Sequence, residues 1–98
     1  MNGVSGNIGS EGELSVNEAF SRKLQVYPNP SNGYYYLTIP ERVNFITVSI
    51  LSSSGQLLSS ENIDVNFPKV NSKNLTSGMY VLKIEADNYI AFKKVIKL

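Results

Sequence analysis

The side chains that most often carry out acid–base chemistry or bind metal ions are absent from this sequence or scattered along it. Its 98 residues contain neither histidine nor cysteine, which excludes imidazole bases, thiol nucleophiles, disulfide bonds and the commonest zinc sites. The carboxylates that remain among the strand-like segments are Glu41, Glu61, Asp64, Glu85 and Asp87. We identify neither a general base in a perturbing environment nor a metal-binding cluster among them. The sequence therefore predicts a domain that is not an enzyme and that uses no cofactor and no metal.

The composition excludes further classes of function. Nine basic and eight acidic side chains give a net charge of +1, and the one lysine cluster is Lys93, Lys94 and Lys97, so the charge footprint of a nucleic-acid-binding protein is missing. We expect no nucleic-acid partner. No stretch approaches the ~20 apolar residues of a membrane-spanning helix, and no signal peptide opens the chain. The domain is then either cytosolic or the tail of a longer exported protein whose signal peptide lies elsewhere.

The most specific local pattern is the run from Tyr27 to Gly33, which stands between two strand-like segments. Pro28 and Pro30 fix their own backbone angles, remove two backbone donors and favour extended conformations in the residues before them, so the preceding strand must end here. Asn32 and Gly33 accept positive φ, which lets the chain reverse. The run predicts a rigid corner that loses little entropy when a receptor binds it, with an ordinary turn as the alternative.

From residue 24 onward, apolar and polar residues alternate with the period of two that indicates β-strands. The strands that we expect are 24–27, 34–39, 43–51, 56–65, a short piece at 69–72, one that opens at residue 80 and one that follows a turn at 87–88. In the strand 43–51 we expect Ile46, Val48 and Ile50 to face inward. In 56–65 the inward face is ambiguous, which indicates a β-bulge or an edge strand.

The last strand contains two sets of residues that point to opposite faces. Its larger apolar residues are Ile90, Phe92, Ile96 and Leu98. We expect this set to face inward, interrupted by Lys94, and we expect Lys93 and Lys97 to face outward beside Val95. The strand would then offer a partner an open edge, positive charge and an apolar contact together. An exposed edge would also let the isolated domain form edge-paired or swapped dimers.

Two glycines mark turns between the strands. In the hairpin around residues 52–56, Gly55 is expected in the left-handed conformation of a type I turn with a G1 bulge. Leu75, Gly78 and Tyr80 have the spacing of a tyrosine corner between the fifth and sixth strands, in which the tyrosine hydroxyl bonds to upstream backbone. With six or seven short strands, the sequence predicts an all-β domain: an immunoglobulin-like antiparallel β-sandwich of Greek-key topology.

The N-terminal residues have a different composition. Residues 1–13 are rich in Gly, Ser, Asn and Glu without a hydrophobic period, so we expect a flexible tether. The stretch from Leu14 to Arg22 favours either a short edge strand or a helical turn. We therefore divide the chain into a flexible linker with a possible short edge element, residues 1–23, and a β-sandwich domain, residues 24–98.

Four blocks of this sequence resemble a known family in their order and spacing. They are Tyr27-Pro28-Asn29-Pro30 with Gly33, then Ser54-Gly55-Gln56, then Leu75 with Ser77-Gly78-Met79-Tyr80, and last Lys93-Lys94-Val95-Ile96-Lys97-Leu98. On these blocks, residues 24–98 are similar to the type A C-terminal sorting domains of the type IX secretion system of Bacteroidetes, in which the last block also ends the chain. The adjacent tyrosines at 34–36 depart from the family pattern.

The resemblance implies a non-catalytic domain that directs an N-terminal cargo protein from the periplasm through the outer-membrane translocon, with an outer-membrane shuttle protein and a sortase as further partners. The sortase would cut in the linker, which we place between Gly3 and Gly12, and leave the cargo at the outer membrane, on the cell surface or secreted. By position, the residues implied in recognition and sorting are Pro28, Asn29, Pro30, Gly33, Lys93, Lys94, Val95, Ile96, Lys97 and Leu98. We assign structural corners to Gly55, Leu75, Gly78 and Tyr80.

Two other readings of the sandwich stay open. A generic immunoglobulin-like adhesion or spacer module has the same fold but gives no reason for the terminal block. A carbohydrate-binding β-sandwich could stack a sugar on Tyr34, Tyr35 and Tyr36, although residues along one strand alternate between its faces, so at most two of them share a surface.

Overall fold

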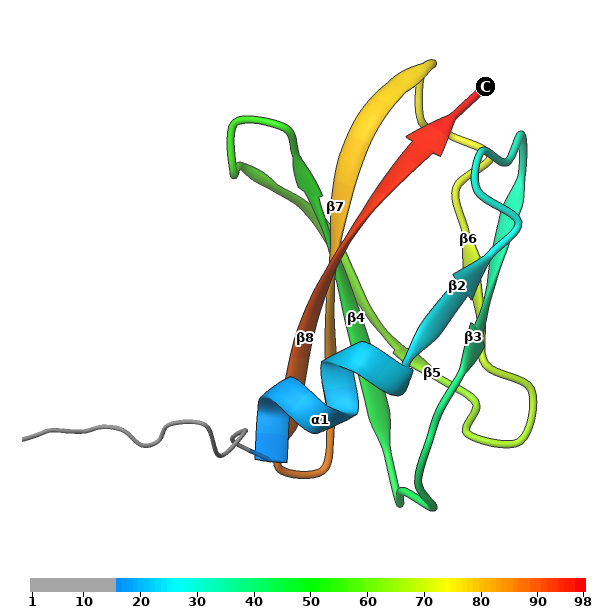
Figure 1. Cartoon of the computed structure of the whole chain (residues 1–98). Coiled ribbons are helices and arrows are strands. Elements are labelled where there is room, and N and C mark those ends of the chain that lie inside the picture. Colours follow the sequence, from blue (N-terminus) through cyan, green and yellow to red (C-terminus); the bar gives the residue numbers. More distant parts are fainter. Residues whose placement is uncertain (1–15) are drawn as a thin grey trace, which may run out of the picture.

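A computed structural model of the chain describes residues 16–98, with side chains from residue 18 onward. Within these residues, one helix is followed by seven strands (Figure 1). They are α1 (Val16–Lys23), β2 (Gln25–Tyr27), β3 (Tyr34–Thr38), β4 (Ile46–Ser52), β5 (Leu57–Ile63), β6 (Lys69–Asn71), β7 (Gly78–Ala86) and β8 (Tyr89–Lys97). The predicted all-β class is confirmed.

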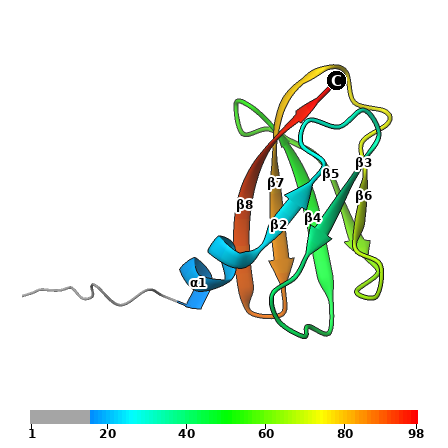
Figure 2. The same cartoon turned by 45° about the vertical axis from the view of Figure 1, so that its right-hand side comes forward.

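In the described part of the chain, the strands form two antiparallel sheets that face each other as the layers of a sandwich (Figures 1 and 2). One sheet has the order β2-β3-β6 and the other β5-β4-β7-β8. The chain leaves the larger sheet after β5, forms β6 in the smaller sheet, and returns as β7 beside β4. This order matches the A-B-E and C′-C-F-G sheets of immunoglobulin-like domains, so the predicted sandwich is confirmed.

The core lies between the sheets and is filled by the inward faces of the strands. Ile46, Val48 and Ile50 on β4 are buried, as their alternation predicts. Leu82 and Ile84 on β7 face the same core, because they pair in register with Ile50 and Val48. The other strongly buried apolar side chains include Leu24, Tyr35, Leu37, Val70, Ala86, Ala91 and Val95. Each large side chain in this core stabilises the fold by roughly 1.5–3 kcal/mol relative to an exposed one.

The predicted hairpin turn is present between β4 and β5. Gly55 has a φ of +94°, and its N–H donates to the backbone oxygen of Ser52 at 2.9 Å. The register of the two strands shifts between Ile50 and Leu51, and β5 lies at the edge of its sheet. The ambiguous pattern of residues 56–65 therefore results from both a bulge and an edge position.

The tyrosine corner is also confirmed. The Tyr80 hydroxyl donates to the backbone oxygen of Thr76 at 2.7 Å, and the ring of Tyr80 is buried. Gly78 has a φ of +153°, a conformation that residues with a side chain rarely adopt. Leu75 packs partly buried against the core. The corner connects β6 to β7, the fifth and sixth strands, where the sequence places it.

The segment before β2 is a helix rather than an edge strand. Phe20 on α1 is buried in the core and its ring stacks on Tyr89, with 4.5 Å between the ring centroids and 6° between the planes. The Lys93 ammonium donates to the backbone oxygen of Ser21 at 2.7 Å. Although the sequence assigns this segment to the linker, α1 packs on the sandwich. The domain boundary at residue 24 stays a prediction. The expected flexible tether and the sortase cleavage site within it lie outside the described residues.

The predicted orientation of the last strand is wrong. On β8 the inward side chains are Tyr89, Ala91, Lys93, Val95 and Lys97, and the outward ones are Ile90, Phe92, Lys94 and Ile96. Phe92 is 57% exposed, whereas Lys97 is 8% exposed. The register with β7 decides this orientation: Tyr80 and Ile84 point into the core, so their partners Val95 and Ala91 must do so too.

Candidate recognition site

The two sequence blocks assigned to recognition meet in the structure. The loop between β2 and β3 lies beside the end of β8 (Figure 2). Ser31 and Lys97 form a parallel β-bridge: the Ser31 N–H donates to Ile96 O at 3.0 Å, and the Leu98 N–H donates to Ser31 O at 2.8 Å. Residues about 65 positions apart in the chain thus become neighbours in one short ladder.

Asn29 extends this ladder with its side chain. Its Nδ2 donates to the backbone oxygen of Lys94 at 3.1 Å, and its Oδ1 accepts the N–H of Ile96 at 2.9 Å. A carboxamide carries a donor and an acceptor, so it binds a strand edge as a peptide group of a neighbouring strand would. Pro28 and Pro30 flank this side chain, are exposed, and follow cis peptide bonds. We call the contact between residues 28–31 and 94–98 the clamp.

Tyr35 supports the clamp from inside the sandwich. Its ring is almost completely buried, and its hydroxyl donates to Ile96 O, the oxygen that also accepts the Ser31 N–H. Burial raises the pKa of Tyr35 above its ordinary value, with a smaller contribution from the neighbouring Tyr80. The alternation of β3 places this tyrosine on the same face as Leu37, but no local pattern indicates which backbone oxygen its hydroxyl reaches.

Gly33 has a different role from the one the sequence indicates. Neither Asn32 nor Gly33 has positive φ, so that expectation is wrong. Gly33 is buried instead, and its backbone oxygen accepts the N–H and the hydroxyl of Ser72 at 2.8 and 2.9 Å. The Ser31 hydroxyl donates to Tyr34 O at 2.6 Å and accepts the Gly33 N–H at 3.3 Å. The hydrogen bonds of Ser31 and Ser72, rather than residues with positive φ, fix the conformation of this loop.

The clamp closes part of the strand edge that the sequence predicts to be open. Lys94 O, both backbone groups of Ile96 and the N–H of Leu98 are bonded to residues of the β2–β3 loop. A partner strand cannot pair with these groups while the loop is in place. At this end of β8, a partner has access to the outward face of the strand rather than to its edge.

That outward face is mostly apolar. It carries a row that we call the outer stripe, made of Ile90, Phe92, Ile96 and Leu98 on or just after β8 and Met79 on β7. Met79 belongs to the row because it pairs with Ile96 across the two strands. Lys94 is exposed within the stripe, whereas Lys93 is half-buried and the ammonium of Lys97 donates to Leu98 O at 2.9 Å. Large exposed apolar patches of this kind mark interaction sites.

The residues predicted for recognition therefore differ in exposure. Those at the surface are Pro28, Asn29, Pro30, Lys94, Ile96 and Leu98, those that are buried are Gly33, Val95 and Lys97, and Lys93 is half-buried. Three residues of the stripe were not among those predicted for recognition: Met79, Ile90 and Phe92. The signal for Ile90 and Phe92 was the apolar set of β8, which was assigned to the wrong face, whereas Met79 lies on β7.

Within residues 16–98, the helix α1 is not long and apolar enough to cross a membrane. The same residues hold no group of three or more acidic side chains placed to bind a metal ion.

Comparison with known protein families gives a match over the β-sandwich. No curated protein matches the chain. The family model described as the secretion system C-terminal sorting domain matches residues 25–98, the sandwich from β2 to the last residue. This match includes the proline run, the glycine hairpin, the tyrosine corner and the last strand, so the chain belongs to the family of type IX secretion system C-terminal sorting domains.

Proposed function

We propose that this domain is a non-catalytic signal that guides a cargo protein through the outer-membrane translocon, and that a sortase removes it. The cargo precedes the domain, crosses the periplasm with it and is delivered to a shuttle protein at the outer membrane. The sortase cuts in the linker and attaches the cargo to the cell surface. The membership in a sorting-domain family supports export toward the cell surface or the medium, and the clamp and stripe support a reading surface on β8.

The observation that carries this proposal is the outer stripe. In a strand with one face on the core, polar residues are expected on the other face. On β8 the large apolar side chains Phe92 and Ile96 face solvent instead, while the charged Lys97 faces inward. Burying one such side chain against a partner yields roughly 1.5–3 kcal/mol, so the stripe offers a docking partner a large gain. Lys94 within the stripe supplies a charge that orients the encounter.

The clamp gives the stripe a fixed shape. Asn29 and Ser31 hold the backbone on one side of β8, and β7 pairs with it on the other. A strand end held on both sides loses little conformational entropy when a partner binds. We infer that the translocon binds the outer stripe together with the exposed prolines of the loop.

The test is a fusion of a reporter to residues 1–98, expressed with a signal peptide in a host that has the type IX system. The double variant Phe92→Ser/Ile96→Ser should leave the reporter in the periplasm. Its matched control is Leu57→Ser/Leu58→Ser, which changes two exposed apolar residues on β5 at the opposite edge of the same sheet. The control should reach the surface, and circular dichroism should show that both variants are folded.

Two outcomes would contradict the proposal at different levels. If the unaltered fusion stays in the periplasm, the domain is not a sorting signal in this host. If the unaltered fusion and the stripe variant both reach the surface, the domain is a sorting signal but the secretion machinery does not bind the outer stripe.

Mass spectrometry of the released domain tests the sortase step, since its new N-terminus should lie between residues 3 and 12.

A further inference from the structure

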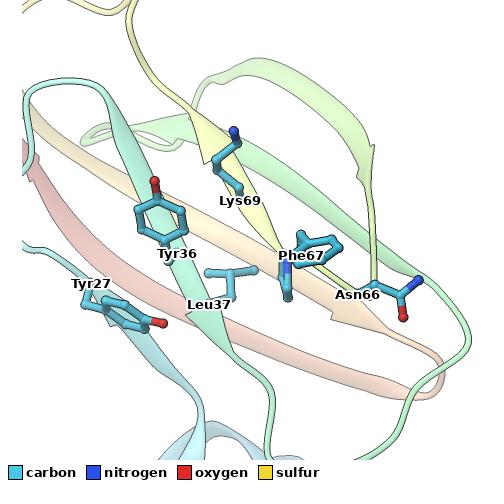
Figure 3. A pocket seen from close by; sticks show the side chains of 7 residues that line it. Tyr27, Tyr36, Leu37, Asn66, Phe67 and Lys69 are labelled. Atoms are coloured by element: carbon cyan, nitrogen blue, oxygen red, sulfur yellow. The ribbon is translucent and has the colours of Figure 1, made fainter.

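A second surface lies on the smaller sheet, on residues other than those of β8. It is an open groove of about 400 Å³ lined by side chains of β2, β3 and the β5–β6 connection. Figure 3 shows Tyr27 and Tyr36 on neighbouring strands, with Leu37 between them and Phe67 in this view. Phe67 is 79% exposed, and about half of each tyrosine is exposed as well.

The backbone places these rings where they are. Tyr27 and Tyr36 are direct cross-strand partners, with 5.9 Å between the ring centroids and 31° between the planes. Phe67 sits on a tight turn, in which its N–H donates to Asp64 O at 3.3 Å and the Asn66 N–H donates to the Asp64 carboxylate at 2.8 Å. The groove is therefore bounded by aromatic rings that the core does not need, on elements that hold them in position.

The lining has the character of a sugar site. Aromatic rings offer flat apolar faces on which the C–H face of a pyranose ring can lie, and the hydroxyls of the tyrosines give each ring a polar end. The Asn66 carboxamide and the Lys69 ammonium add further hydrogen-bonding groups to an otherwise apolar cavity. A few polar groups around apolar walls is the usual composition of a small-molecule site.

The charge of the groove selects among sugars. Lys69 lines it, and no residue of the lining is acidic. The Lys69 ammonium lies 4.6 Å from the ring centroid of Tyr34, a cation–π contact on a ring that does not line the groove. Lys73 lies at the same distance from that ring but does not line the groove. A carboxylate on the sugar would complement Lys69.

From these contacts we infer that the groove binds an acidic oligosaccharide. One pyranose ring stacks on Tyr27 and Tyr36, Phe67 closes the far side, and a sugar carboxylate pairs with Lys69. The groove uses other residues than the export signal, because none of the clamp residues and none of the outer stripe lines it, although Tyr27 directly precedes Pro28 of the clamp.

The test is an NMR titration of the ¹⁵N-labelled chain, residues 1–98, with a tetramer of 1,4-linked galacturonate and with the matching neutral galactose tetramer. The acidic tetramer should shift the amide signals of Tyr27, Tyr36 and Phe67. Phe67→Ala should weaken its binding about tenfold, and Phe45→Ala, an exposed phenylalanine outside the groove, should not. Lys69→Gln should remove the preference for the acidic tetramer, while Lys73→Gln should keep it.

Three results would overturn the inference. The first is that neither tetramer shifts the amide signals of the groove at about 10 mM, a concentration at which even a weak site would be occupied. The second is that the acidic tetramer binds the Phe67→Ala variant as tightly as it binds the unaltered chain. The third is that a proline-rich decapeptide shifts the groove signals while neither sugar does, which would make the groove a peptide site.

Discussion

Asn29 holds the last strand at Ile96, although 67 residues separate the two in the sequence. Its side-chain oxygen accepts the Ile96 N–H at 2.9 Å, while its Nδ2 donates to Lys94 O at 3.1 Å. The first and the last of the four sequence blocks are therefore one structural unit. A change in the loop between β2 and β3 should be felt in the strand that the loop closes.

Asn29→Asp tests this contact with almost no change in size. The aspartate keeps an acceptor for Ile96 but loses the donor to Lys94 O and places a carboxylate against that oxygen. We expect the free energy of unfolding, measured by urea denaturation at pH 7, to fall by about 1–2 kcal/mol. Asn32→Asp, at an exposed position of the same loop, should change it by less than about 0.5 kcal/mol. Equal losses in the two variants would contradict the role of Asn29.

Tyr35→Phe tests the support under the clamp. The variant loses the hydroxyl that donates to Ile96 O, which should cost about 1 kcal/mol at pH 7. Since burial, with Tyr80 nearby, raises the pKa of Tyr35, the folded state holds this proton more tightly than the unfolded state does. The linked stability is complete below about pH 10 and is lost as the pH rises through the folded pKa. The variant's stability should therefore fall less steeply above pH 10.

Tyr89 is a second tyrosine whose pKa is raised, and it serves as the comparison. The pKa of Tyr89 is raised by its hydrogen bond to Glu41, then by burial and by the charges of Glu41 and Asp87. Tyr89→Phe should also flatten the alkaline fall, measured by urea denaturation between pH 7 and 11. If neither variant differs from the unaltered chain above pH 10, these tyrosines do not govern its alkaline stability.

Two glycines that the sequence treats alike should respond differently to alanine. An added Cβ at Gly55 meets nothing within 4 Å, so the cost of Gly55→Ala comes from its φ of +94° and should be about 1 kcal/mol. Gly33 lacks positive φ, and its added Cβ would lie 3.6 Å from carbons of Lys73, an ordinary contact. Gly33→Ala should cost less than about 0.5 kcal/mol. Thermal melts that rank the two variants in the reverse order would refute this account.

Phe20→Ala measures how firmly α1 is attached. The side chain is buried and stacked on Tyr89, so its loss should lower the free energy of unfolding by about 3 kcal/mol. Arg22→Ala changes an exposed residue of the same helix and should have little effect. A chain that begins at residue 24 should be destabilised as much as Phe20→Ala. If it is as stable as the full chain, the sandwich does not need the helix, and the predicted boundary at residue 24 is supported.

Local sequence patterns predicted the structure correctly where they allowed a single arrangement. On β4 the residues Ile46, Val48 and Ile50 alternate with smaller polar ones, so a single face can be buried. The turn at Gly55 and the corner at Tyr80 each depend on residues a few positions apart, and both were predicted from spacing. These features are fixed by short-range sterics and alternation, which the sequence displays directly.

Local sequence patterns gave no correct prediction where the structure depends on pairing with a residue far away in the sequence. On β8, hydrophobicity alone favours Phe92 as an inward residue, but pairing with β7 turns it outward and places Lys97 inside. The bridge between Ser31 and Lys97 likewise has no local signal, because it depends on how the loop folds back on the last strand. Such conflicts between local pattern and fold concentrate at functional sites, and here both occur within the proposed recognition surface.

The two orientations of the last strand make opposite predictions for its lysines. Lys97 is buried and its ammonium donates to Leu98 O, so Lys97→Met, which keeps the length of the side chain, should lower the free energy of unfolding by about 1 kcal/mol and leave surface delivery of a reporter fusion unchanged. Lys94 is exposed within the outer stripe, so Lys94→Glu should slow delivery several-fold by reversing the charge that a partner meets. Surface display over time, measured by protease accessibility, distinguishes the variants. If Lys97→Met blocks delivery while Lys94→Glu does not, the outer stripe is not the part of β8 that the secretion machinery contacts.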